Sequence, residues 1–200
     1  MRDTQLYFLE GDCIERFGEE NGRLIFSLTQ GIYSILCEKA DSRGSDAIKK
    51  HLLENLYPTM AFYKALRAFD YPEREALELV MAETAKSAQV KKQAQERFAA
   101  LPCTYLLYRL FVRSVIQKSF PAEGWDARWV RLDGGEIYFD FTRCLYKDVC
   151  DAEDCPELCC VFCANDDIAF AGLMPKIRFE RSGTLGRGDD CCDFHFIKNS

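Results

Sequence analysis

The stretch WDARWVRLDGGEIYFDFT, residues 125–142, decides the fold class of this chain. Upstream of it, apolar residues recur every three to four positions, whereas within it they alternate. A period of two is the spacing of a β-strand that buries one face. The Asp133-Gly134-Gly135 turn supplies the glycines that a tight hairpin needs. The stretch is therefore predicted to be a hairpin of two strands, residues 125–132 and 136–142.

Two further strands are predicted downstream, at residues 176–181 and 191–197. In the second of them Cys192, Phe194 and Phe196 share one face, and Asp193 and His195 share the other. The intervening chain is predicted to hold short helices and connections, in the order 145–152 (helix), 156–164 (helix), 165–167 (turn or cap), 168–173 (short apolar segment) and 182–190 (glycine-rich loop).

The upstream part of the chain has the period of amphipathic helices. Helices are predicted at 13–38 with a break at Gly18 or Gly22, and at 46–68 with Ser45 as N-cap and a kink or a fresh helix start at Pro58. Two more are predicted, from Pro72 through the polar residues 86–97 and at 104–119. Helices followed by strands indicate an α+β fold, with N-terminal helices packed on a C-terminal four-stranded antiparallel sheet. We expect one domain over residues 1–200, in which 1–120 is mainly a helical scaffold and 121–200 holds the sheet.

The charge, the apolar content and the cysteines of the chain exclude several classes of function. A net charge of -6 argues against a nucleic-acid partner, and no apolar run reaches the roughly 18 residues of a membrane span. The first residues do not have a signal-peptide pattern, so the eleven cysteines are expected to be reduced thiols in a cytoplasm. The expected partner is a small-molecule substrate, and self-association into a homo-oligomer is left open.

Eight of the eleven cysteines fall between residues 144 and 192, together with the nearby His195, so this region holds the candidate site. A zinc site would have to combine Cys160 and Cys163 with Cys192 and His195, because thiolate and imidazole suit zinc. Only Cys160 and Cys163 have a typical ligand spacing, and most of the thiols are expected to be core residues. We therefore predict neither a metal nor another cofactor.

Other residues of this region have the chemistry of a catalytic site. A cysteine nucleophile needs a base, a cation or a helix N-terminus nearby, and Cys163 and Cys192 are the candidates. Asp166 and Asp193 could divide the roles of acid and base, although Asn-Asp-Asp and Gly-Asp-Asp are also ordinary loop sequences. Arg181, at a strand end, could hold a carboxylate or form a surface ion pair.

The order and spacing of several motifs resemble the L-2-amino-thiazoline-4-carboxylic acid hydrolase family. The motifs are RCLY at 143–146, FCANDD at 162–167, FERSGTLGRGDDCCDFHF at 179–196 and, in the helical half, YPTMAFYKAL at 57–66. The likeness extends from about residue 45 onward. It implies a bacterial enzyme that opens a cyclic isothiourea by adding water. It maps Cys144, Cys163 and Cys192 onto the motif cysteines, with Asp166, Arg181, Thr184, Gly188 and Asp193 beside them, and leaves Cys150, Cys155, Cys159, Cys160 and Cys191 outside the pattern.

The resulting hypothesis is a hydrolase that acts on a carbon–nitrogen bond, other than a peptide bond, in a small cyclic isothiourea or amidine. The predicted catalytic residues are Cys163, Cys192, Asp166 and Asp193, and the predicted substrate-binding residues are Arg181, Thr184, Cys144 and His195. Two alternatives stay open. One is a non-enzymatic ligand-binding or sensor domain, and the other is a thiol-ligated metal-binding protein.

Overall fold

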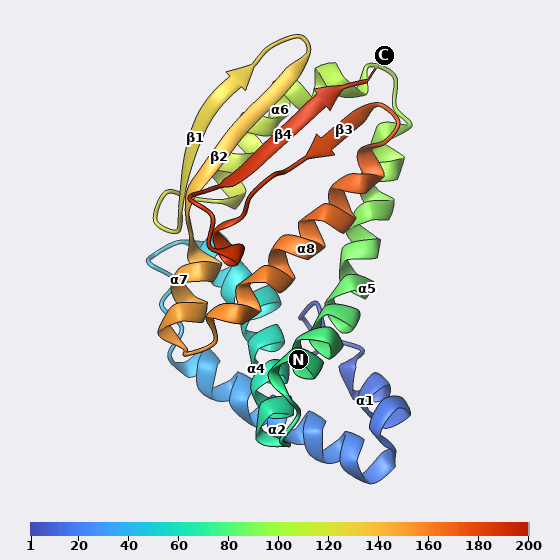
Figure 1. The fold of residues 1–200 in the computed structure, drawn as a ribbon, viewed down its shortest axis with the longest axis vertical. Coiled ribbons are helices and arrows are strands. Elements are labelled where there is room, and N and C mark those ends of the chain that lie inside the picture. The colour runs from blue at the N-terminus through green and yellow to red at the C-terminus, as the bar shows by residue number, and fades with distance from the viewer. Residues whose placement is uncertain (200) are drawn as a thin grey trace. The chain divides into compact units, whose positions relative to one another are not determined.

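The computed structural model describes residues 1–199, and it confirms the α+β class (Figure 1). The chain forms two compact units, Met1–Ser87 and Ala88–Ser200, which are described separately below. Helix α5, Glu73–Ala99, runs through the boundary between them. That residues 1–200 act as a single domain stays a prediction.

The first unit is helical. Helices α1, Leu9–Phe17, and α2, Glu19–Glu38, are separated at Gly18, whose φ of 79° lies in the region that glycine tolerates best. This confirms the predicted break. Gly22 permits the close packing of the two helices, since a Cβ there would lie 2.5 Å from the carbonyl oxygen of Cys13.

The second predicted helix is present as three consecutive segments. They are α3, Asp46–Lys50, the π-helical segment η1, His51–Leu56, and α4, Tyr57–Ala68. Ser45 caps α3 by accepting a hydrogen bond from the amide of Ile48 at 3.4 Å, and Pro58 occupies the first turn of α4, as predicted. The polar residues 86–97 lie within α5, which confirms that they form a helical extension.

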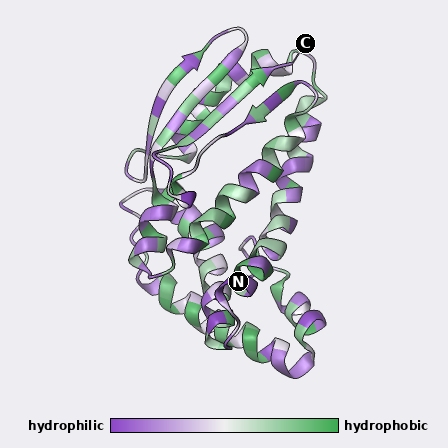
Figure 2. Ribbon diagram, viewed as in Figure 1, coloured by the Kyte–Doolittle hydropathy of each residue, from purple (hydrophilic) through white to green (hydrophobic). Residues whose placement is uncertain are grey.

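The second unit contains the sheet. Its strands are β1, Trp125–Leu132, β2, Glu136–Cys144, β3, Ile177–Glu180, and β4, Cys192–Lys198. They are antiparallel in the order β1-β2-β4-β3, which confirms the predicted four-stranded sheet. Hydrophobic and hydrophilic residues alternate along the strands in Figure 2.

One face of this sheet is an aromatic layer. Phe139 of β2 stacks on Phe194 of β4 with ring centres 5.2 Å apart. Phe196 contacts Tyr108 of α6, Thr104–Ser119, and Phe170 of α8, Cys159–Phe170, at 5.1 Å in each case. Helices α6 and α8 therefore cover this face, and the opposite face carries the polar residues of β2 and β4.

The chain between β2 and β4 contains α7, Leu145–Ala152, the 3₁₀ segments η2, Pro156–Leu158, η3, Ala171–Leu173, and η4, Leu185–Arg187, and helix α8. The predicted turn at 165–167 is wrong, because α8 continues through these residues to Phe170. Two interactions favour the longer helix. Phe170 contributes to the aromatic layer, and Arg181 compensates the adjacent charges of Asp166 and Asp167.

Within residues 1–199, no helix combines the length and the apolar character that crossing a membrane requires.

Replacement of Phe139 by Ala should destabilise the protein by about 3–5 kcal/mol, because the ring is buried and touches Phe194, Phe196 and Phe141. Urea unfolding followed by circular dichroism measures the change. Val130→Ala removes a side chain that is 52% exposed, so its cost should stay well below that of Phe139→Ala. Equal costs would contradict the aromatic layer as the main core of the sheet.

Candidate thiol and carboxylate site

Four cysteines from different parts of the second unit form one thiol cluster: Cys144, Cys159, Cys163 and Cys192. Cys144 ends β2, Cys192 begins β4, and Cys159 and Cys163 lie one turn apart on α8. The thiol of Cys159 is hydrogen-bonded to Cys144 and to Cys163, and Cys163 is also hydrogen-bonded to Cys192. The structure therefore brings together the three cysteines of the family motifs and adds Cys159.

The glycine-rich loop packs directly against this thiol cluster. A Cβ at Gly186 would lie 3.1 Å from the sulfur of Cys163 and 3.1 Å from the backbone of α8, so only glycine fits without a shift. The amide of Leu185 donates a hydrogen bond to the sulfur of Cys192 at 3.2 Å. The loop thus supplies a backbone donor beside a position where a side chain would not fit.

The surroundings of Cys163 favour its thiolate. The hydrogen bond from Cys159 lowers the pKa of Cys163 most, followed by that from Cys192. Burial opposes these effects, whereas the Thr184 hydroxyl and the Arg181 cation add to them. The buried Oγ1 of Thr184 has no hydrogen-bond partner of good geometry within the described residues, so its hydroxyl can turn toward the thiolate. Together these effects place the pKa of Cys163 well below that of an ordinary thiol.

Two of the other thiols in the cluster, Cys159 and Cys192, supply protons, whereas the pKa of Cys144 is lowered, chiefly by its hydrogen bond with Cys159. Burial and hydrogen bonds to neighbouring sulfurs raise the pKa values of Cys159 and Cys192. Cys159 carries one proton and faces both Cys144 and Cys163, so it can donate to only one of them at a time. Cys163 has the additional donors described above, which makes it the stronger candidate for the thiolate.

Arg181 follows β3 and its side chain is only 4% exposed. Its Nη2 donates to the carbonyl oxygen of Cys163 and to Oδ1 of Asp167, each at 2.6 Å, and its guanidinium lies 5.4 Å from the centre of the Phe194 ring. Its Nη1 lies 3.5 Å from Asp166 but forms no hydrogen bond within the described residues. Arg181 therefore fixes α8 to the sheet and keeps one buried donor available.

Asp166 lies three residues after Cys163, so the two side chains project from one side of α8. Loss of solvation raises the pKa of Asp166 to about 7, although 46% of its side chain remains exposed. The Arg181 cation opposes the rise, and negative charge on Cys163 adds to it. Because Asp167 makes the shorter ion pair with Arg181, Asp166 can hold a proton without leaving the cation uncompensated.

Asp193 lies apart from the thiol cluster. Its carboxylate accepts hydrogen bonds from the amides of Ser182 and Gly183 and from the Ser182 hydroxyl, at 2.6–3.0 Å. Burial alone would raise the pKa of Asp193, but these hydrogen bonds outweigh it and lower the pKa. The ionised carboxylate holds the start of the glycine-rich loop against β4.

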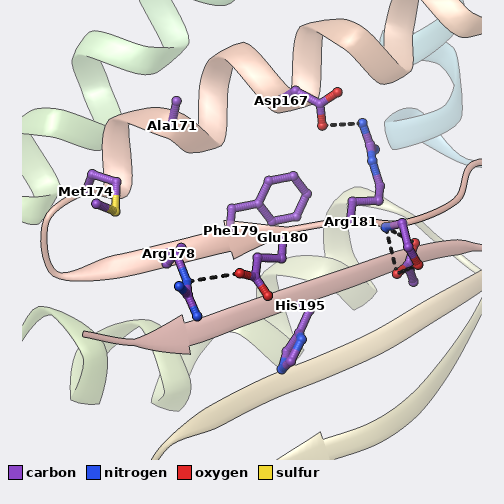
Figure 3. Close-up of a pocket in the computed structure, with 10 residues that line it drawn as sticks. Asp167, Ala171, Met174, Arg178, Phe179, Glu180, Arg181 and His195 are labelled. Carbon is purple, nitrogen blue, oxygen red and sulfur yellow. Dashed lines mark hydrogen bonds and ion pairs between the residues drawn. The ribbon is translucent and has the colours of Figure 1, made fainter. Parts of the chain in front are cut away.

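His195 projects from the opposite face of β4 from Cys192, as the alternation predicted. Its ring lies 5.1 Å from Tyr138, and Nε2 is 3.7 Å from Glu136. It lines an open groove of about 870 Å³ at β3 together with Asp193 and Arg181. Figure 3 shows His195 directed away from the Arg181–Asp167 ion pair. The predicted substrate-binding residues are thus divided between this groove and the thiol cluster.

The four residues considered for zinc do not all lie together, although Cys163 and Cys192 are neighbours in the thiol cluster. His195 lies on the other face of the sheet, and the thiol of Cys160 donates to the carbonyl oxygen of Glu157 at 3.1 Å. Within residues 1–199, no group of three His, Cys, Asp or Glu side chains is arranged to hold a metal ion.

The family motifs in the sequence do not include Cys159, although it lies in the thiol cluster. A signal for it was present, because Cys159 and Cys163 both fall in the helix predicted from Pro156, at a spacing that puts them on one face. Asp167 was assigned to a turn, and its role as the ion-pair partner of Arg181 depends on the full length of α8.

The fold and the site define an α+β protein in which a thiol cluster adjoins a carboxyl group and a buried arginine. The family model of L-2-amino-thiazoline-4-carboxylic acid hydrolase matches residues 49–196, and the chain belongs to that family. The resemblance seen in the sequence motifs is thereby confirmed. Neither the curated proteins nor the solved structures include a match to the chain.

The raised pKa of Asp166 predicts a pH-dependent difference in stability between the wild type and Asp166→Asn. The folded-state pKa is about 7 and the unfolded value is about 4, so between these values the folded state binds more protons. The wild type should therefore lose stability relative to Asp166→Asn as pH rises from 4 to 7, and the difference should then level off. Urea unfolding at several pH values measures it.

The matched control for this experiment is Asp190→Asn in the exposed loop. Its stability difference from the wild type should not reproduce the fall between pH 4 and 7. A pH-independent difference for Asp166→Asn would show that Asp166 ionises normally in the folded protein.

Proposed function

We propose that this protein is a hydrolase that opens a small cyclic isothiourea or amidine resembling L-2-amino-thiazoline-4-carboxylate by adding one water. One observation supports this proposal: Cys163 and Asp166 lie about one helical turn apart on α8. The surroundings of Cys163 favour its thiolate, and those of Asp166 favour its protonated carboxyl group. A nucleophile beside an acid is what ring opening at an amidine carbon requires. Membership in the L-2-amino-thiazoline-4-carboxylic acid hydrolase family supports the choice of substrate class.

In the first step the Cys163 thiolate attacks the carbon between the ring sulfur and the ring nitrogen, and a carbon–sulfur bond to the enzyme forms. Asp166 donates its proton to the ring nitrogen, and the bond from that nitrogen to the attacked carbon breaks. The substrate is then an open chain, held on Cys163 as a thioimidate. Cys192 is the second candidate nucleophile, but its raised pKa makes it a proton donor to Cys163 in this proposal.

In the second step water attacks the same carbon, and the Asp166 carboxylate accepts a proton from it. Collapse of the adduct expels Cys163 as a thiolate and leaves a carbonyl oxygen on the product. The sum is substrate plus one water, and both side chains return to their starting protonation states. The acid and base roles thus fall to Asp166, because Asp193 is engaged by the loop amides.

Substrate binding is assigned to Arg181 and Thr184. Arg181 Nη1 and Thr184 Oγ1 are buried polar atoms without hydrogen-bond partners in the described residues, and both residues act on Cys163. Buried donors of this kind are costly unless a ligand satisfies them. Arg181 would hold the substrate carboxylate, and Thr184 and Cys144 would contact the ring. His195 would contact a substituent only if the substrate extends into the groove at β3.

The proposal includes a bacterial origin, which the family resemblance implies, and a cytoplasmic location, which eleven cysteines without a disulfide favour. It also includes self-association. Four large apolar side chains on the outer side of α6 are more than two-fifths exposed, and clustered exposure of this kind is typical of protein interfaces. They are Leu106, Leu110, Phe111 and Val115.

Incubation of the reduced protein with L-2-amino-thiazoline-4-carboxylate should give a product heavier by one water, detectable by mass spectrometry. Cys163→Ser should lower the rate by at least about a hundredfold, because a hydroxyl is a far weaker nucleophile at neutral pH. Cys160→Ser is the matched control on the same helix and should retain activity. Full activity in both Cys163→Ser and Cys192→Ser would remove the covalent mechanism.

Turnover should also report the protonation of Asp166. The wild-type rate should fall as pH rises through about 7, because the acid that protonates the ring nitrogen is lost. Asp166→Asn should be slow at all pH values and should lack this fall. Tight binding of the thiazoline without turnover in the wild type would instead support the ligand-binding or sensor alternative.

A further inference from the structure

The second unit contains two pairs of hydrogen-bonded thiols in different surroundings. One pair is Cys163 and Cys192 in the thiol cluster, and the other is Cys150 and Cys155, between α7 and η2. Both pairs bring two sulfurs within hydrogen-bonding reach. All four residues are buried, so the pairs differ in the charges and hydrogen-bond donors beside them. This difference gives a comparison within one molecule.

The Cys150–Cys155 pair is enclosed. Both residues are buried, and the amide of Cys155 donates to the carbonyl oxygen of Cys150 at 2.9 Å. The hydrogen bond between the two thiols and their burial raise the pKa of Cys150. Buried thiols that stay protonated in this way behave as small hydrophobic groups and react slowly with oxidants.

The Cys163–Cys192 pair has the opposite character. The guanidinium of Arg181 reaches the backbone of Cys163, the amide of Leu185 donates to the sulfur of Cys192, and the polar side chain of Thr184 adjoins Cys163. Positive charge and hydrogen-bond donors stabilise a thiolate, and thiolates are the forms that peroxides oxidise.

We propose that Cys163 and Cys192 form a peroxide-sensitive pair that closes to a disulfide. The Cys163 thiolate attacks hydrogen peroxide, the oxygen–oxygen bond breaks, and a sulfenic acid and hydroxide form. The Cys192 thiol then attacks the sulfenic sulfur, a sulfur–sulfur bond forms, and the hydroxyl leaves with the thiol proton as water. The two sulfurs together lose two electrons, which peroxide accepts.

Cys192 suits the resolving role better than Cys159 does. Cys159 and Cys163 lie one turn apart on α8, and their side chains project side by side from a rigid helix. Cys192 lies on β4 and faces Cys163 from another element. The two sulfurs must approach to about 2.05 Å, and a strand end beside a glycine-rich loop can accommodate that shift more readily than a helix interior.

The consequence rests on the proposed function, since closure of the disulfide would remove the nucleophile. Oxidised protein would be inactive, and reduction by dithiothreitol would restore activity. Formation of the disulfide itself needs no turnover, so it can be tested separately from the hydrolase reaction.

The experiment treats the reduced full-length protein with hydrogen peroxide at a few equivalents, blocks free thiols with N-ethylmaleimide and cleaves before aspartate. Cleavage at those sites yields peptides 148–150, 154–165 and 190–192, which separate the pairs by mass. We expect a link between 154–165 and 190–192, with fragmentation placing it at Cys163, and Cys150 should remain blocked by N-ethylmaleimide. Overturning results are an unmodified Cys163, or equal linkage of 148–150 and 190–192 to peptide 154–165.

Matched variants locate the bond. Cys192→Ser should lose the link and leave a sulfenic acid on Cys163 that dimedone traps, whereas Cys191→Ser should keep the link. Circular dichroism spectra identical to those of the wild type establish that the variants are folded. A link that survives in Cys192→Ser, or that disappears in Cys191→Ser, would contradict the proposal. Absence of thiazoline hydrolysis would overturn the proposed function and leave the disulfide result standing.

Discussion

The burial of the Arg181 guanidinium is the constraint on which the candidate site depends. A buried cation is costly unless charges and acceptors surround it. Here the Cys163 carbonyl and the Asp167 carboxylate accept hydrogen bonds from it, and Asp166 lies 3.5 Å from Nη1. All three groups belong to α8, while the aromatic ring of Phe194 lies beneath. A single side chain at the end of β3 therefore fixes where α8 lies on the sheet, and with it the positions of Cys163 and Asp166.

The same cation explains why the site can hold a thiolate and a protonated acid side by side. Asp167 compensates Arg181 at short range, so Asp166 is not required to ionise. A thiolate at Cys163 then makes ionisation of Asp166 less favourable, and the protonated acid avoids a second negative charge near the sulfur. Each group stabilises the protonation state that the other needs, and this is the division of roles expected of a nucleophile and its acid.

The parts of this arrangement that the sequence predicted are those with a clear period. Alternation in β2 and β4 placed Phe139, Phe194 and Cys192 on the core face and His195 on the other. The helices upstream followed from their apolar spacing and from Gly18, Ser45 and Pro58. The error at 165–167 arose because local propensity, in which Asn and Asp favour turns, was overridden by the tertiary contacts of Phe170 and Arg181.

The sequence pattern predicted only part of the candidate site. Spacing along one helix relates Cys159, Cys163 and Asp166, but no local pattern states that Cys192 and the loop at Gly186 meet them. Those contacts join residues far apart in the sequence, and they depend on the register of β4 against β2. Motif order supplied that information indirectly, which is why the family resemblance identified Cys144, Cys163 and Cys192 together while omitting Cys159.

The residues of the site differ in how far their side chains are exposed to solvent. Cys163 and Thr184 are 8% and 1% exposed, whereas the Asp166 side chain is 46% exposed. Of these three side chains, Asp166 is therefore the one that solvent water reaches most readily. The proposed mechanism asks one residue to give a proton to the ring nitrogen and then to take one from water, which requires a carboxyl group that both the sulfur and solvent can reach. Asp166 is near Cys163 on α8 and partly exposed, whereas Asp193 is held by the loop amides.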